Sequence, residues 1–301
     1  MIDINKDIIL YHGSRGGIDG DIKPVSRVRC DFGRGFYLGE NKNQAKGIVV
    51  EDVSPYFYTI KLKLSNIPND RILVLDGREW LNMILANRKS VQEFNALRIA
   101  DKILEESKKY DVIIGPIADD RMIEAFRRFE QRALTDEGLI ACLQSANMGN
   151  QYVLKTNFAC ENTEILEEKR IFGKEEQNIK KYVKDSREKV ISIVDRMQEK
   201  YQRTGRYLNE IINDEKEKEH PTTKAMETAW DNFFALPKEE RNGIEWNGEK
   251  LRIAVFDDMY LAKCKEDGIT PKQEIVDHFW RNCVDIQGYE PQYCNKVTIE
   301  R

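Results

Sequence analysis

The sequence has few of the residues that usually mark metal and redox sites. Only three of its 301 residues are histidine, and no two of them stand at the spacing of a metal-ligand pair. Six cysteines are scattered without any C-x-x-C pair, which argues against a zinc ribbon or a thioredoxin-type site. We therefore expect reduced thiols, as in a cytoplasmic protein, and no bound metal.

Long apolar runs are also missing. No stretch approaches the about 18 consecutive apolar residues that a transmembrane helix needs. The first segment, MIDINKDIILYHGS, has an apolar run of four residues with acidic flanks, which is too short and wrongly charged for a signal peptide. We expect no membrane contact and a cytoplasmic location, or delivery to another cell by a route that the sequence does not announce.

The chain also lacks an excess of positive charge. Charged residues make up 33% of the sequence, and the formal net charge is -4. This balance predicts a soluble protein and gives no support for a generally basic nucleic-acid binder, although it allows a local basic patch. The length suits one large domain or two small ones.

Residues 1–170 combine strand and helix patterns and are expected to form one domain. The clearest strand signal runs from Tyr56 to Leu64, where apolar residues alternate. Other strands are expected at 7–14, 71–76, around 110–116 and, as the last, at 150–159, with helices at 77–88, 94–107 and 118–134. Because the strands and helices do not alternate strictly, the pattern predicts an α+β fold rather than a doubly wound sheet.

Two further regions follow this domain. Residues 174–219 are rich in charge and keep apolar residues three or four apart, which predicts one long amphipathic helix, or two, or a helix followed by a linker. Residues 220–301 are expected to form a small accessory unit: a helix at 220–236, an Asn-Gly hairpin within 244–256, and a helix that Thr270 caps with Pro271 at its first position. We expect His278, on that last helix, to be a packed or surface histidine.

Three short segments carry the chemistry that can be read from the chain. YHGSR, residues 11–15, follows a strand and places an imidazole next to a bare glycine backbone, which a flat ligand can approach closely. DFGRGFYLGENKNQA, residues 31–45, puts Gly-Arg-Gly before a Phe-Tyr pair and a helix start. NQYVLKT, residues 150–156, places Gln151 at the start of a strand. Taken singly, YHGSR also fits a strand-terminal turn and Tyr37 a core tyrosine.

In this order the three segments resemble the motifs of the ADP-ribosyltransferase fold, most closely its poly(ADP-ribose) polymerase-like branch. The resemblance covers about residues 8–160, and IIGPIADDRM, residues 113–122, looks like part of a bacterial subfamily. It implies a split β-sheet core with flanking helices, NAD+ as substrate and no metal. It also implies a nicotinamide pocket with these binding residues: His12, Gly13, Ser14, Arg15, Gly35, Phe36, Tyr37 and Asn43.

The resemblance also implies individual roles. The Gly13 backbone would pair with the nicotinamide carboxamide, His12 would bond a ribose hydroxyl, and the Tyr37 ring would stack on the nicotinamide. Ser14 and Arg15 would lie near the adenosine. On this view the Gly-Arg-Gly lets the backbone pass close to the ligand before it presents Tyr37.

Two positions depart from the family pattern. Gln151 stands where the family keeps a glutamate; an amide can hydrogen-bond but cannot act as a base. Asp119 or Asp120 is therefore a candidate source of the missing charge, although both residues also suit a helix start. Gly47 stands near the position where the polymerases keep a second stacking tyrosine, and a glycine cannot stack. One aromatic ring of the pocket would therefore be missing, unless Phe36 or Tyr56 supplies it.

The chain is thus expected to be an NAD+-dependent mono-ADP-ribosyltransferase that cleaves the nicotinamide glycosidic bond. It would modify a macromolecule, protein rather than nucleic acid, with a bacterial toxin or effector as one such role. The alternatives are a non-catalytic NAD-binding module and a tRNA 2′-phosphotransferase. Kinase and Rossmann chemistry is disfavoured because no glycine-rich loop has the partners that those sites need. The region after residue 174 would recognise the target, dock a partner or lock the site.

Overall fold

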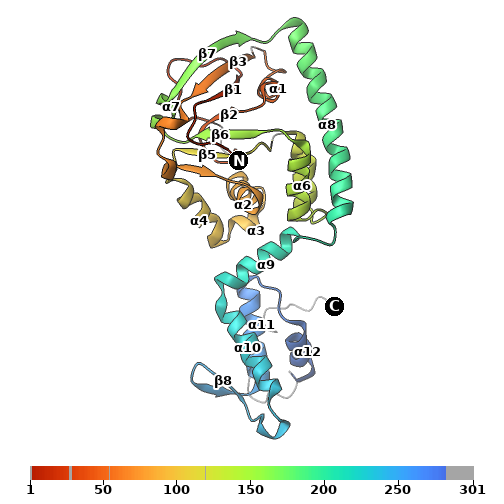
Figure 1. The fold of residues 1–301 in the computed structure, drawn as a ribbon. Helices are drawn as coiled ribbons and strands as arrows, with labels where there is room; N and C mark the ends of the chain where they lie inside the picture. Colours follow the sequence, from red (N-terminus) through yellow and green to blue (C-terminus); the bar gives the residue numbers. More distant parts are fainter. Residues whose placement is uncertain (1, 27–28, 54, 119, 283–301) are drawn as a thin grey trace. The chain divides into compact units, whose positions relative to one another are not determined.

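The computed structural model describes residues 2–26, 29–53, 55–118 and 120–282. The chain divides into two compact units, Met1–Asn209 and Glu210–Arg301, each with its own apolar core (Figure 1). A seven-stranded mixed sheet with flanking helices makes up most of the first unit, and helices with one hairpin make up the second. The predicted α+β class is confirmed.

The sheet of the first unit has one parallel pair, β4 with β5, and its other neighbouring strands are antiparallel. The strands follow one another in space in this order: β4 (Ile72–Val74), β5 (Val112–Pro116), β6 (Asn150–Leu154), β2 (Phe36–Gly39), β1 (Ile8–Ser14), β3 (Tyr56–Leu62) and β7 (Thr163–Arg170).

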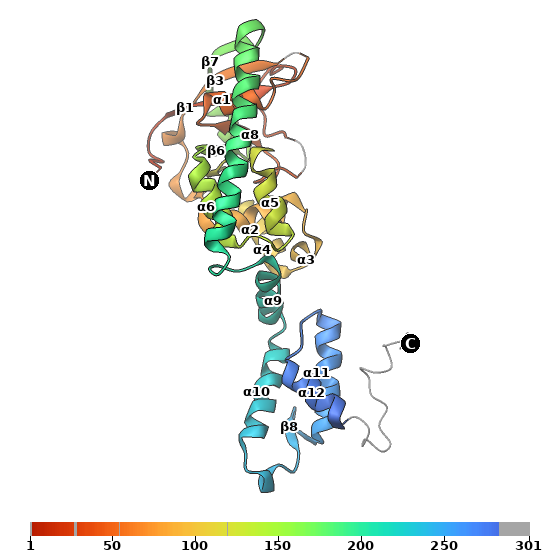
Figure 2. The same cartoon turned by 90° about the vertical axis from the view of Figure 1, so that its right-hand side faces the viewer.

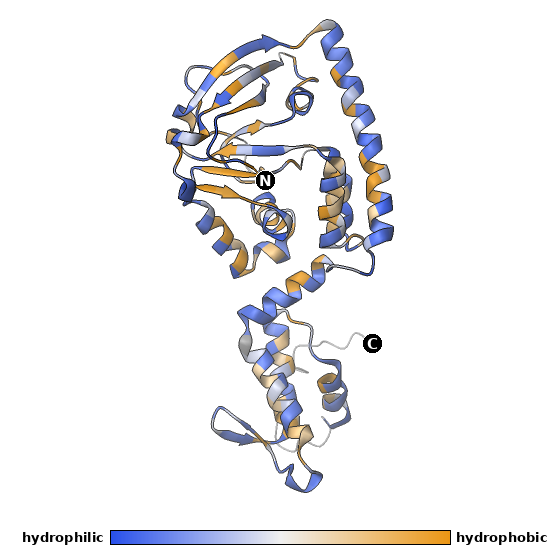
Figure 3. Ribbon diagram, in the orientation of Figure 1, coloured by the Kyte–Doolittle hydropathy of each residue, from blue (hydrophilic) through white to orange (hydrophobic). Residues whose placement is uncertain are grey.

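Alternation of apolar residues decides which side chains of β3 enter the main core of the first unit. In β3 the predicted inner residues Tyr58, Ile60 and Leu62 are all fully buried. They pack with inward residues of β1, β2 and β6 in one core cluster, and Figure 3 shows apolar and polar colours mixed along these strands. Full burial of such side chains contributes about 1.5–3 kcal/mol each, which fixes the register of the strand.

Two strand predictions at the end of the first domain were wrong. The strand expected at 150–159 ends at Leu154, because the Thr156 hydroxyl accepts the Ala159 N–H at 3.2 Å and caps a short helix, α7 (Asn157–Glu161). It is also not the last strand, because β7 follows and pairs with β3. As an edge strand β7 is exposed at most positions, so its sequence carries no alternation to detect.

The sheet is nearly split between β1 and β2. β1 pairs with β3 over seven positions, but among the described residues it pairs with β2 only where Tyr11 meets Gly39. Beyond this pair the loop of residues 15–35 leads the chain away before it returns as β2. Among the described residues, positions 12–14 of β1 therefore have no partner on β2.

Helices cover the sheet of the first unit. The predicted helix at 77–88 is confirmed as α2 (Gly77–Arg88), whereas the helix predicted at 118–134 begins as a 3-10 turn. The remaining helical elements of this unit are α1 (Lys42–Gly47), η1 (Leu64–Asn66), η2 (Asn69–Arg71), α3 (Gln92–Asn95), α4 (Arg98–Ser107), η3 (Asp120–Met122), α5 (Ile123–Glu130), α6 (Asp136–Ala146) and α8 (Gly173–Tyr201).

The prediction of a single helix at 94–107 is wrong, because the helix is interrupted between α3 and α4. The Asn95 side-chain amide donates to the Leu85 and Ala86 carbonyls at 3.1 and 3.2 Å, near the end of α2. Leu97 then takes an extended conformation and is buried. Satisfying the last carbonyls of α2 therefore takes precedence over continuing one helix.

The charged region after residue 174 forms two helices, α8 and α9 (Leu208–Glu219). α8 buries Ile179, Val190, Ile193, Val194 and Met197 and runs beside α1 and α6 (Figures 1 and 2). The first compact unit therefore extends past residue 170 as far as Asn209.

Asp136, the first residue of α6, fixes the segment after α8 and the start of α2 against α6. Its fully buried carboxylate accepts the Arg206 N–H at 2.7 Å and Arg78 Nε at 2.8 Å. We expect Asp136→Ala to lower the free energy of unfolding by roughly 3 kcal/mol, because it removes several charge-assisted bonds at a buried site. Asp185→Ala, at an exposed position on α8, is the control and should change it by less than about 0.5 kcal/mol in urea unfolding. Equal losses would contradict this account.

The second unit contains the elements α10 (Pro221–Ala235), η4 (Lys238–Glu240), β8 (Ile244–Trp246), β9 (Glu249–Leu251), α11 (Ile253–Asp267) and α12 (Gln273–Asn282). The predicted hairpin is confirmed as β8 and β9. Asn247 and Gly248 both have positive φ, 49° and 82°, as the tight turn between twisted strands requires.

The sequence misplaced two helix starts in this unit. The hairpin was expected to run to Phe256, but α11 begins at Ile253 and buries Phe256, Tyr260 and Leu261 on a helical repeat. The predicted cap at Thr270 is wrong, because α12 begins only at Gln273. The Lys272 N–H donates to the Tyr260 hydroxyl at 2.8 Å, so a tertiary contact sets the start of α12.

His278 is a packed histidine, as predicted. Its Nδ1 lies 2.5 Å from the fully buried Asp257 carboxylate, which also accepts Trp230 Nε1–H at 2.9 Å. These contacts join α10, α11 and α12. Burial raises the pKa of Asp257, and the partner contacts counteract that rise.

No helix in the described ranges combines the length and the apolar character that a bilayer crossing requires.

Candidate functional site

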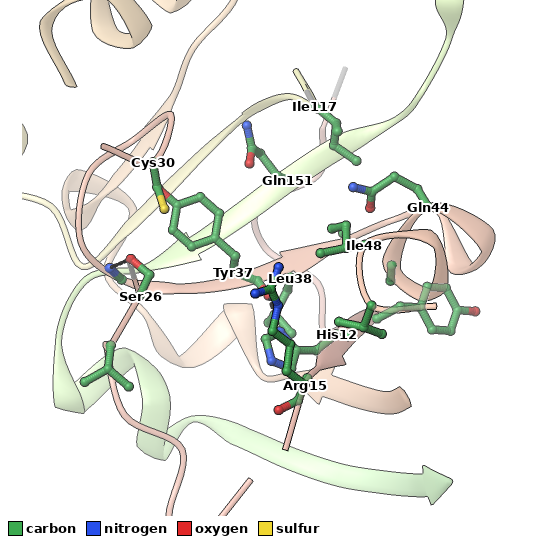
Figure 4. Close-up of a pocket in the computed structure, with 18 of the residues that line it drawn as sticks. His12, Arg15, Ser26, Cys30, Tyr37, Leu38, Gln44, Ile48, Ile117 and Gln151 are labelled. Carbon is green, nitrogen blue, oxygen red and sulfur yellow. Dashed lines mark hydrogen bonds between the residues drawn. The ribbon is translucent and has the colours of Figure 1, made fainter. Parts of the chain in front are cut away.

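A cavity of about 450 Å³ opens where β1 and β2 part (Figure 4). We call it the first cavity. Its walls come from residues 11–16 at the end of β1, from β2, from one side of α1 and from the loop of residues 15–35; Ile117 and Gln151 close it. A site in the gap between two strands leaves backbone groups available to a ligand.

The first cavity brings together seven of the residues singled out in the sequence. They come from three separate segments of the chain: His12, Gly13, Ser14, Arg15, Gly35, Tyr37 and Gln151. Two of them are partly engaged elsewhere, since the Ser14 hydroxyl donates to the Gly17 carbonyl at 2.8 Å and Arg15 pairs with Asp52 at 3.2 Å.

The other predicted residues lie elsewhere. Phe36 belongs to the apolar core, where its ring packs on His12 with centroids 4.3 Å apart. Asn43 is exposed and borders a neighbouring cavity. Asp119 lies outside the described residues, and Asp120 begins η3 without a described side chain.

His12 is held as a neutral acceptor. Its Nδ1 lies 2.7 Å from the Tyr37 carbonyl oxygen, which can only accept, so Nδ1 carries the proton and Nε2 keeps a lone pair. Burial lowers the pKa of His12 to about 4, and the bond to the carbonyl counteracts this only in part. The bond also joins β1 to β2 beside the split.

Tyr37 presents a ring face whose hydroxyl is already engaged. The hydroxyl donates to the Gly33 carbonyl at 2.6 Å and accepts the Phe32 N–H at 3.1 Å. Burial, followed by the nearby Asp31 carboxylate, raises the pKa of Tyr37. The ring is therefore a fixed, neutral aromatic wall of the first cavity.

The two glycines before this tyrosine also have structural roles within the chain, besides the place of Gly35 in the cavity lining. Gly33 has a φ of +75°, which forms the turn that reaches Tyr37. A Cβ on Gly35 would lie 2.5 Å from Val153 Cγ1 and 2.8 Å from the Leu154 carbonyl oxygen, so Gly35 allows β2 to pack on β6. Likewise, a Cβ on Gly13 would meet the Ala45 carbonyl oxygen at 2.2 Å, so α1 lies directly on β1.

The Gln151 side chain is held by two hydrogen bonds that its amide nitrogen donates. Nε2 donates to Asp31 Oδ2 at 3.0 Å and to the Pro116 carbonyl at 3.1 Å, which sets the orientation of the amide. Its Oε1 has no donor among the described residues and lies on the side of the Tyr37 ring (Figure 4). The side chain thus offers the first cavity one acceptor oxygen.

Asp31 places a carboxylate directly behind Gln151. Arg88 holds this carboxylate through Nε at 2.8 Å and also donates to the Ala118 carbonyl at 2.6 Å. A carboxylate is thus present beside Gln151, at a position that the sequence analysis did not consider, although Asp31 does not line the first cavity. Its position as the first residue of the glycine-containing stretch gave no sign of this role.

Gln44 is a site residue that the sequence analysis missed. It lies in the first turn of α1, is 6% exposed, and borders both the first cavity and the neighbouring one. Its side-chain amide has no hydrogen-bond partner in the described part of the chain. The amide borders open cavity space on both sides, so its donor and acceptor atoms are accessible to a ligand with complementary polar groups.

Two aliphatic side chains from the end of α1 and the residues after it contribute to the cavity wall, beside the aromatic residues Tyr11 and Tyr37. Ile48 and Val49, at the end of α1, line the first cavity. Gly47 does not, because its backbone lies against α8, where an added Cβ would meet Val183 Cγ2 at 2.9 Å. Neither Phe36 nor Tyr56 lines the first cavity, so neither supplies the ring that the sequence analysis considered.

Comparison with known families gives one match. Residues 8–164 match the model of a family described as protein of unknown function (DUF3990), which is more than half of the chain. The chain belongs to the DUF3990 family. Neither the curated proteins nor the solved structures contain a match to it. The DUF3990 region includes every residue that lines the first cavity, whereas α8 and the second unit follow it.

Proposed function

We propose that the first cavity binds NAD+ and that the protein is a mono-ADP-ribosyltransferase of the poly(ADP-ribose) polymerase-like type. The observation that carries this proposal is the meeting of His12, Tyr37 and Gln151 around one cavity. They come from three separate segments, in the chain order that the resemblance implies. Their polar atoms are oriented by neighbours, as a site for a rigid ligand requires.

The nicotinamide ring would lie between Tyr37 and the aliphatic wall of Ile48 and Val49. The cationic ring of NAD+ is attracted to the electron-rich face of a tyrosine. The buried Gln44 amide would pair with the carboxamide, because each of these groups offers one donor and one acceptor. The backbone of Gly13 is a second partner for the carboxamide.

The nicotinamide ribose would meet two acceptors. His12 Nε2 and Gln151 Oε1 would each accept a hydrogen bond from a ribose hydroxyl. Polarised hydroxyls stabilise the positive charge that develops on the ribose as the glycosidic bond breaks. The electrons of that bond pass to the nicotinamide nitrogen, so the leaving group departs neutral.

Transfer would then need only a nucleophile on the face opposite to the departing nicotinamide. The nucleophile forms a bond to C1′ and releases its proton to solvent or to a base of the acceptor. Since the Gln151 amide cannot accept that proton, we propose a single transfer rather than chain extension. We propose a protein acceptor and a role as a bacterial toxin or effector acting in the cytoplasm, with the chain after residue 174 recognising the target.

A second candidate is an NAD-binding module without turnover. It is favoured by one observation: the Gln151 amide is anchored between Asp31 and Pro116, and no carboxylate lines the first cavity among the described residues. The two candidates share a ligand and differ in whether nicotinamide is released.

The test is transfer of labelled ADP-ribose from NAD+ to proteins of a cell lysate. We expect Tyr37→Ala to reduce labelling at least about 10-fold, because it removes the stacking face, whereas Tyr37→Phe keeps the ring and at least a third of the labelling. Protease treatment of the product should remove the label and nuclease treatment should not. Absence of labelling by the wild-type protein, with nicotinamide still released, would refute a protein acceptor.

A further inference from the structure

A second cavity of about 270 Å³ borders the first one. Three residues line both: Arg15, Gln44 and Ile48. A ligand that fills the first cavity therefore has a direct continuation past Gln44. The walls of the second cavity come from α1, from η3 and from α8.

α8 supplies this cavity with side chains from beyond the DUF3990 region. Tyr182 and Arg187 line it from α8, and Arg121 lines it from η3. Val183 packs so closely on Gly47 that a Cβ there would be only 2.9 Å away, which fixes α8 against α1. The second cavity is thus a built feature of the first unit.

Three of the residues that line this cavity are arginines: Arg15, Arg121 and Arg187. Arg121 is 8% exposed and donates to the Tyr182 hydroxyl at 3.2 Å. Arg187 is exposed and has no ion-pair partner among the described residues. Two carboxylates are also present, Glu51 and Asp52, and Asp52 pairs with Arg15 at 3.2 Å. A guanidinium group presents several N–H donors in one plane. Three such groups around so small a volume can bind the oxygens of a phosphate group.

We infer that the second cavity is a phosphate subsite. This inference deepens the proposed function, on which it rests for the source of the phosphate. One source is the diphosphate of NAD+, reached from the first cavity past Gln44. The other is a phosphate group of the acceptor. The shared chemistry is a phosphate bound by Arg121 and Arg187, with Arg15 at the junction.

The experiment measures binding of pyrophosphate and of ADP-ribose to the full chain by calorimetry. We expect Arg187→Glu to weaken pyrophosphate binding at least about 10-fold, because it replaces a cation by an anion at an exposed position that folding does not require. Arg196→Glu is the matched control on the exposed side of α8, away from the cavity, and should change binding by less than twofold. Arg121→Lys, which keeps the charge but not the fork, should weaken binding by an intermediate factor.

Two further measurements on Arg187→Glu, ADP-ribose binding and labelling of the acceptor, identify the source of the phosphate. If Arg187→Glu raises the dissociation constant of ADP-ribose as well, the phosphate is that of the dinucleotide. If ADP-ribose binding is unchanged and only labelling of the acceptor falls, the phosphate is that of the acceptor. Either result supports the subsite.

The inference is overturned if pyrophosphate fails to bind the wild-type chain at millimolar concentration, or if Arg187→Glu and Arg196→Glu behave alike. Nicotinamide release is measured on the same preparations. If either of these results is found while nicotinamide is released normally, only this inference is refuted. If pyrophosphate binding depends on Arg187 but no nicotinamide is released, only the proposed enzyme activity is refuted.

Discussion

His12→Ala is expected to reduce nicotinamide release from NAD+ at least about 100-fold, because it removes both functions of the imidazole. Nε2 is the proposed acceptor for a ribose hydroxyl, and Nδ1–H joins β1 to the Tyr37 carbonyl beside the split. His12→Asn separates the two functions. Its shorter amide can still donate to the Tyr37 carbonyl but does not reach the ribose, so stability should recover and release should not.

The control for this series is His220→Ala, which removes a partly exposed histidine of the second unit. It should leave release within about twofold of wild type. Equal release by wild type and His12→Ala would contradict the role proposed for His12.

The low pKa of His12 also predicts how stability depends on pH. Folding lowers this pKa to about 4 from the ordinary 6.5, so the unfolded chain binds the proton more tightly. The contribution of neutral His12 to the free energy of unfolding is fully present above about pH 6.5. It is lost as the pH falls towards 4, and the loss is about 3 kcal/mol at most. In His12→Asn this part of the pH dependence should disappear. Fluorine NMR of fluorotryptophan-labelled protein can follow it, since Trp80 is the one tryptophan before residue 209.

Gln151→Glu is expected to make the first unit less stable as the pH rises. The introduced carboxyl would lie about 3 Å from the Asp31 carboxylate and beside the Pro116 carbonyl, where only a protonated group fits. Its pKa should therefore rise above the ordinary value of about 4.3. The protonated form keeps a donor for Asp31, so stability is retained near pH 5 and falls by about 2–3 kcal/mol towards pH 8.

The double exchange, Asp31→Asn with Gln151→Glu, should remove this slope. The introduced amide can accept from Arg88 and donate to the introduced carboxylate, which reverses the polarity of the original pair. A carboxylate would then face the developing positive charge on the ribose. At pH 8 the double variant should release nicotinamide at least about 10-fold faster than Gln151→Glu alone.

Gln198→Glu is the matched control for this exchange, because its neighbour is the Arg128 guanidinium rather than a carboxylate. It should show no loss of stability between pH 5 and 8. If Gln151→Glu also shows none, or if Asp31→Asn fails to remove the slope, Asp31 does not fix the Gln151 amide.

Local patterns in the sequence were sufficient to predict the parts of the fold that depend on neighbours along the chain. The alternation in β3, the helix from Gly77 and the Asn-Gly turn are all present. The errors arise where a distant contact decides the outcome. Asn95 caps α2 and breaks a helix, and the Tyr260 hydroxyl sets the start of α12.

The same distinction applies to the first cavity. His12, Tyr37 and Gln151 could be proposed because each belongs to a recognisable segment. Asp31 and Gln44 could not, since their importance lies in what they face after folding. The sequence analysis explained the two glycines around Arg34 by a ligand alone and did not foresee that a turn and the packing of β2 on β6 also require them.

The most direct test of the central claim, that NAD+ lies in the first cavity against Tyr37, is calorimetric titration with the non-hydrolysable carba analogue of NAD+. The account predicts saturable binding at one site per chain, competition by free nicotinamide, and affinity at least about 10-fold weaker in Tyr37→Ala. No binding by the wild-type chain, or equal binding by Tyr37→Ala, would contradict it.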